Sequence, residues 1–167
     1  MTTARVVSPR TAIALIVATV LALAMMAVGV QAKASRDGAR FEALVGNTLT
    51  GEAGAIRGVP AGGLPWVLDR GEARISDGSQ IDVRVEGLVL AAGDNAGTNP
   101  QPEFRAIVSC LTHDTHAVEN RTSAPAPATP EGDARIRDVL DLPDPCLAPI
   151  VFVTNAAGTS WFAVSGF

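Results

Sequence analysis

From Leu64 onward, turns rich in glycine and proline cut the chain into short apolar segments. Residues 81–86 (IDVRVE) alternate apolar and charged side chains, the period-two pattern of a half-buried strand. Residues 104–112 (FRAIVSCLT) are mostly apolar and favour a central strand covered on both faces. The pattern predicts an all-β domain over 64–167: an antiparallel β-sandwich or a partly open barrel of about seven short strands.

The first thirty-four residues have the composition of an export signal. Arg5 and Arg10 precede an uncharged run over 11–30, and Ala32-Lys33-Ala34 follows as an A-x-A cleavage site. The run from residue 12 to residue 30 would also form a helix of about 28 Å, close to the thickness of a membrane core. Residues 1–34 are therefore a signal peptide or an uncleaved N-terminal anchor. Either interpretation places the remainder outside the cytoplasm, secreted or membrane-anchored by residues 11–30.

Residues 35–63 separate this helical signal or anchor from the predicted domain. Seven glycines lie in this stretch, and its apolar residues show weak periodicity. Glycine adds backbone entropy that a weakly apolar segment can hardly offset. The composition predicts a glycine-rich flexible spacer over 35–63.

Removal of the signal makes the chain more acidic. The whole sequence carries 13 basic and 17 acidic residues, a net charge of −4. Cleavage after Ala34 removes three basic residues and no acidic one, which leaves a net charge of −7 and no lysine. Phosphate contacts depend on clustered basic residues, so nucleic acid is not an expected partner. A membrane contact is expected only through an uncleaved N-terminal segment.

The two cysteines are the strongest covalent signal. Two cysteines in a small exported domain most simply form one disulfide, here Cys110–Cys146. That bond would tie the proline-rich loop 143–149 to the apolar strand at 104–112. The chain contains no C-x-x-C pair that would indicate a thiol-exchange site.

Metal binding is the alternative use of the same region. Cys110, His113 and His116 form a C-x2-H-x2-H series, and Cys146 would add a fourth ligand for zinc or copper. His113 and His116 are the only histidines in the chain. Residues three apart on a strand point to opposite faces, so this series requires a turn beginning near Thr112. A disulfide would also consume both sulfurs.

Catalytic chemistry has few candidate residues in this sequence. The chain has no tyrosine and no G-x-S-x-G motif, and it has no lysine after cleavage. A hydrolase site would have to be assembled from distant residues, for instance His113 or His116 with Asp114 or Glu119. The sequence predicts no catalytic residue and no cofactor.

Three segments from Arg74 onward carry a resemblance: 75–78 with 81–85, 104–110 and 145–153 (PCLAPIVFV). Over about residues 74–167 the chain resembles uncharacterised small exported bacterial all-β proteins with two cysteines. The resemblance implies a shared all-β fold with paired cysteines. It implies no activity, ligand or catalytic residue.

These observations favour a non-catalytic binding or structural module of the cell envelope or extracellular space, with an unknown protein or envelope component as its partner. Strand edges and the loops 91–103 and 113–130 are the expected contact regions. An exported metal-binding protein using His113 and His116, and a small secreted hydrolase, are the alternative functions.

Overall fold

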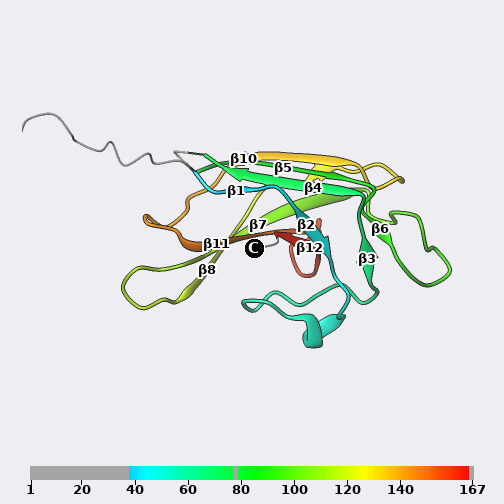
Figure 1. Cartoon of the computed structure of the whole chain (residues 1–167), viewed down its shortest axis with the longest axis horizontal. Helices are drawn as coiled ribbons and strands as arrows, with labels where there is room; N and C mark the ends of the chain where they lie inside the picture. Colours follow the sequence, from blue (N-terminus) through cyan, green and yellow to red (C-terminus); the bar gives the residue numbers. More distant parts are fainter. Residues whose placement is uncertain (1–37, 77–78, 166–167) are drawn as a thin grey trace, which may run out of the picture. The chain divides into compact units, whose positions relative to one another are not determined.

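The computed structural model describes residues 38–76 and 79–165 as an all-β unit (Figure 1). Its helical content over these residues is one short 3-10 helix, η1 (Gly51–Gly54). The strands are β1 (Arg40–Phe41), β2 (Leu44–Gly46), β3 (Trp66–Val67), β4 (Arg70–Ile75), β5 (Gln80–Glu86), β6 (Val89–Leu90), β7 (Glu103–Leu111), β8 (Val118–Thr122), β9 (Ala126–Pro127), β10 (Ala134–Val139), β11 (Leu147–Asn155) and β12 (Trp161–Ser165). The all-β prediction is confirmed. More strands form than the sequence suggested, because two-residue strands leave no readable periodicity.

Two antiparallel sheets make up most of this unit. One has four strands in the order β1-β4-β5-β10, and the other runs β2-β12-β11-β7-β8 with β9 also paired to β7. A third, two-stranded sheet joins β3 to β6. Figure 1 shows β10, β5, β4 and β1 in one layer and the strands of the larger sheet in another.

The main core lies between the inner faces of these two sheets. Ile81, Val83 and Val85 of β5 point into it, whereas the charged residues between them face away. Phe104 of β7 meets Trp66 edge to face, with ring centroids 6.2 Å apart. Burial of such side chains is the largest favourable contribution to the stability of a domain this size.

The larger sheet is covered on both faces. In β7, five consecutive residues from Ala106 to Cys110 are buried, as the continuous apolar run predicted. On the outer face a second cluster joins Ile107, Phe152 and Trp161 to Val59 and Ala61. The segment before Leu64 therefore forms the outer cover of this sheet.

This arrangement corrects the expectation of a flexible spacer over 35–63, for its described residues 38–63. Strand β1 is the edge strand of the four-stranded sheet and pairs with β4, where Arg40 lies opposite Arg74. Strand β2 pairs with β12 in the larger sheet. Gly46 passes so close to the carbonyl of Trp66 that a Cβ there would collide with it. Glycine at this position permits close backbone packing, so the folded unit begins well before Leu64.

A disulfide joins Cys110 of β7 to Cys146 in the loop before β11, which confirms the predicted pairing. Cys110 is fully buried in the main core. A disulfide is compatible with an oxidising compartment outside the cytoplasm.

The predicted signal peptide or anchor, residues 1–34, lies outside the described residues. Within 38–76 and 79–165, no helix combines the length and apolar character needed to cross a membrane.

Candidate functional site

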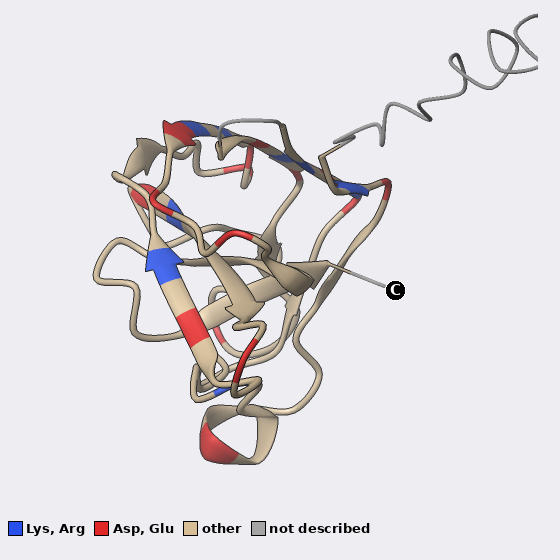
Figure 2. Cartoon of the chain, turned by 90° about the vertical axis from the view of Figure 1, so that its left-hand side faces the viewer, with Lys and Arg blue, Asp and Glu red and all other residues tan. Residues whose placement is uncertain are grey.

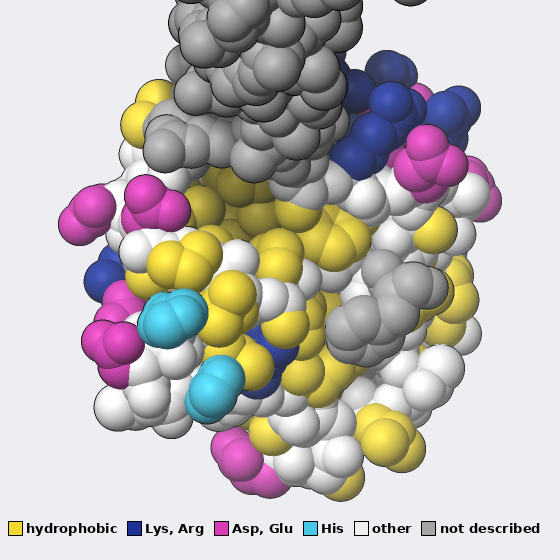
Figure 3. All heavy atoms as spheres, turned by 60° about the vertical axis from the view of Figure 1, so that its left-hand side comes forward, with side chains coloured by type: hydrophobic (Ala, Val, Ile, Leu, Met, Phe, Trp, Pro, Cys, Tyr) yellow, Lys and Arg dark blue, Asp and Glu magenta, His cyan; other side chains and the backbone are white. Residues whose placement is uncertain are grey.

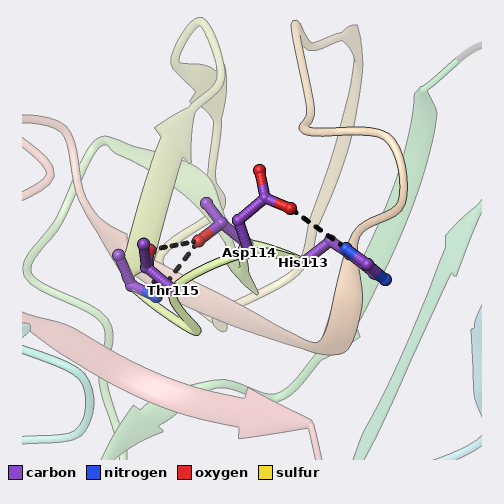
Figure 4. A network of polar contacts seen from close by, with 5 residues as sticks. His113, Asp114 and Thr115 are labelled. Atoms are coloured by element: carbon purple, nitrogen blue, oxygen red, sulfur yellow. Dashed lines mark hydrogen bonds and ion pairs between the residues drawn. The ribbon is translucent and has the colours of Figure 1, made fainter.

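His113 and His116 both lie on the loop that joins β7 to β8. Thr112 and Thr115 build this loop: the Thr112 hydroxyl accepts a hydrogen bond from the backbone N–H of Ala117 at 3.1 Å. His113 Nδ1 lies 3.2 Å from Asp114 Oδ1 (Figure 4). Both imidazoles are exposed, and hydrophobic side chains lie beside them on the surface (Figure 3).

The chain turns after Thr112, as the metal-site hypothesis required, but the set of metal ligands is incomplete. Both sulfurs are bonded to each other, so the version of the site with cysteine ligands is wrong. Among residues 38–76 and 79–165, no three His, Cys, Asp or Glu side chains are placed to hold a metal ion. A site using His113 and His116 alone stays a prediction.

A different surface gathers the arginines. The outer face of the four-stranded sheet consists of Arg40, Arg70, Glu72, Arg74, Gln80, Asp82, Arg84, Glu86, Arg135, Arg137 and Val139, and we call it the arginine face. It carries six of the nine arginines in the described residues and three carboxylates, a formal charge of +3. The remaining described residues carry three arginines and twelve carboxylates. Figure 2 shows the basic segments running across this sheet.

The register places like charges side by side on this face. Arg40 lies directly opposite Arg74, and Arg84 lies directly opposite Arg135. Like charges in directly opposed positions destabilise a sheet. Acidic neighbours offset part of this repulsion, since Glu42 lies 3.5 Å from Arg40 and Glu86 lies 2.7 Å from Arg84.

Asp82 offsets part of this repulsion at the centre of the face. Arg135 donates to it from Nε at 2.9 Å and from Nη2 at 2.6 Å, and Arg137 Nε donates at 3.1 Å. The Arg135 hydrogen bond, supported by Arg137, lowers the pKa of the Asp82 carboxyl below its usual value, although partial burial opposes this. Asp82 is therefore charged at neutral pH and holds both guanidinium groups in place.

We expect Asp82→Asn to lower the free energy of unfolding by up to about 1 kcal/mol at neutral pH, since the network is partly exposed. A carboxyl with a lowered pKa in the folded state stabilises the fold above its unfolded pKa, and this contribution is lost as pH falls through the folded value. The difference between wild type and variant should stay constant above about pH 5 and shrink below about pH 4. Urea unfolding across this pH range measures it, and a difference that grows on acidification would contradict the assignment.

Shallow concavities lie along the same face. The first, of about 180 Å³, is lined by charged side chains that include Arg40, Arg74 and Glu72. A second, of about 500 Å³, shares Arg74 and Asp82 with the first and continues along β5 and β10. A third, of about 450 Å³, lies at Arg84 and Arg135. Only the first hollow has more arginines than carboxylates in its lining, because the second and the third each have two of both.

The sequence contained a signal for this surface that a count of total charge missed. Arginines and acids recur at every second residue in 70–74 (RGEAR), 82–86 (DVRVE) and 135–137 (RIR). Alternate residues of a strand share one face, so this spacing already placed them together within each strand. Which of these residues lie opposite one another on neighbouring strands is known only from the strand register in the structure.

No family model, curated protein sequence or solved structure matches the chain.

Proposed function

We propose that the protein is an exported antiparallel β-sandwich that acts as a binding module of the cell envelope or extracellular space, and that its arginine face binds an anionic partner. The observation that carries this proposal is the separation of charge: a face of +3 on a protein that is otherwise strongly acidic. Screening limits the range of the interaction between exposed charges to about 8 Å at physiological ionic strength. A ligand at the arginine face therefore experiences mainly the local positive charge.

The chemistry of the face supports binding. Arginine presents a planar set of donors that matches carboxylate, sulfate and phosphate oxygens, and it stays charged at all relevant pH values. Among the described residues, no carboxylate lies within 4.0 Å of the guanidinium groups of Arg70 and Arg74. The Cys110–Cys146 disulfide and the predicted signal support the extracytoplasmic location.

Replacement of one arginine on each of three strands tests the proposal. We expect Arg74→Gln, Arg84→Gln and Arg137→Gln together to weaken binding of anionic probes by roughly 10- to 100-fold, because each exposed charge contributes roughly 0.5–1 kcal/mol. The probes are polygalacturonate, polyglutamate and vesicles containing phosphatidylglycerol. Affinity for the purified full-length chain is measured at low ionic strength.

A matched control lowers the net charge equally at another place. Ala91→Glu, Ala96→Glu and Ala117→Glu together change three exposed loop residues and add the same three negative charges. We expect this variant to lose no more than about twofold in affinity. Equal losses in both variants, or no binding of any probe by the wild-type protein, would show that the arginine face is not the binding surface.

A further inference from the structure

We infer that the concavity between β1 and β4 is a subsite for the carboxylate of an acidic sugar, and that the partner of the arginine face is a linear acidic polysaccharide. This inference rests on the proposed function and names its ligand class. The charged residues that line the subsite are Arg40, Arg74, Arg135, Glu72 and Asp82.

Two guanidinium groups provide the oxyanion contact. Arg40 and Arg74 are directly opposed across the β1–β4 pair, and both side chains are exposed. Neighbouring strands lie about 4.8 Å apart, so one carboxylate reaches donors on both side chains. A bound oxyanion would also relieve the repulsion between the two cations.

The charge balance of the subsite selects among anions. The lining contains three arginines and two carboxylates, a surplus of one positive charge, and Glu42 lies 3.5 Å from Arg40 beside it. A group with one negative charge neutralises this surplus, whereas a phosphate dianion would exceed it and approach Glu72 and Asp82 unfavourably. The subsite therefore suits a carboxylate better than a phosphomonoester.

Glu72 adds the feature that distinguishes a sugar acid from a simple anion. Its carboxylate is half-buried in the concavity, and no described residue forms an ion pair with it within 4.0 Å. Carboxylate oxygens only accept hydrogen bonds, so Glu72 can accept one from a ligand hydroxyl. A uronic acid supplies hydroxyl donors beside its own carboxylate and thus satisfies Glu72 and the two arginines together.

The hollows along the sheet give the ligand its extended form. The neighbouring concavity shares Arg74 and Asp82 with the subsite and continues toward Arg137 and Val139. A further sugar of the same chain would meet Arg137 there, together with the carboxylates of Asp82 and Asp138. The alternation of arginine and carboxylate across the face matches a chain that alternates charged groups and hydroxyls.

Two double variants with the same change in charge test the subsite. Arg40→Gln with Arg74→Gln removes the opposed pair, and Arg70→Gln with Arg84→Gln removes two arginines from the rest of the face. With trigalacturonate as the probe, we expect the first to lose at least about thirtyfold in affinity and the second only about fivefold. Arg40→Lys with Arg74→Lys keeps the charge but loses the paired geometry, and several-fold weaker binding is expected. The methyl ester of trigalacturonate should not bind.

The outcomes separate this inference from the proposed function. Equal losses in both glutamine variants, or unchanged binding of the methyl ester, would overturn the subsite. Binding of polyglutamate or anionic vesicles without any binding of trigalacturonate would overturn the sugar assignment and leave the arginine face as a binding surface. No binding of any anionic probe would overturn both.

Discussion

Replacing Cys110 and Cys146 by alanine should lower the free energy of unfolding by about 4 kcal/mol. The bond links residues 36 positions apart, and a loop of that length loses a large amount of conformational entropy in the unfolded chain when it is closed. Domains of this size are stable by roughly 5–15 kcal/mol, so the loss is a large fraction of the total. Urea unfolding of wild type and variant measures it through the shift in midpoint.

Reduction of the wild-type protein provides the control for this variant. If the crosslink itself is responsible, reduced wild type and the double alanine variant should unfold at similar urea concentrations. Cys110 is fully buried, so the alanine variant should be slightly the less stable because it leaves a small cavity. A loss below about 1 kcal/mol in both proteins would contradict a stabilising role for the bond.

Trp161→Ala should lower the free energy of unfolding by roughly 3–5 kcal/mol. Trp161 is only 5% exposed, and it packs with Phe152 and Val59 on the outer face of the larger sheet. Its indole N–H donates to the carbonyl of Gly54 at 3.0 Å, which attaches η1 to β12. The substitution removes both the ring and this hydrogen bond. Thermal and urea unfolding measure the effect.

Two further variants divide this loss into its parts. Trp161→Phe keeps most of the buried ring but leaves the Gly54 carbonyl without its donor, and a loss of roughly 1–3 kcal/mol is expected. Leu49→Ala changes a side chain that lies in the segment before Leu64, as Gly54 does, but is 62% exposed. Its effect on the free energy of unfolding should therefore stay within about 0.5 kcal/mol. If Trp161→Ala and Leu49→Ala had equal effects, the segment before Leu64 would not cover the sheet.

The regular strands were predictable because their burial follows simple periods. Residues 81–86 alternate and 104–111 are mostly apolar, and these form β5 and β7, with one and two buried faces. The segment 38–63 was not predictable in the same way. Its glycines at 38 and 46 support close backbone contacts with Ile75 and Trp66, yet in sequence they are indistinguishable from the glycines of a flexible linker.

The disulfide could be predicted from the sequence, whereas the arrangement of the arginine face could not. Only one pairing of two cysteines is possible within the chain, so Cys110–Cys146 followed from composition and the expected compartment. The opposed pairs Arg40–Arg74 and Arg84–Arg135 depend on strand register, which joins residues up to 51 positions apart. Alternation within one strand identifies its outward residues, but it does not identify the strand beside it.

Nuclear magnetic resonance titration of the protein with trigalacturonate tests the central claim most directly, because it locates the bound ligand residue by residue. The binding account predicts that the side-chain Nε–Hε signals of Arg40 and Arg74 shift first, followed by those of Arg137 and Arg135, while the loop carrying His113 and His116 is unaffected. Shifts concentrated in that loop or in residues 91–103, with the arginine signals unchanged, would contradict it.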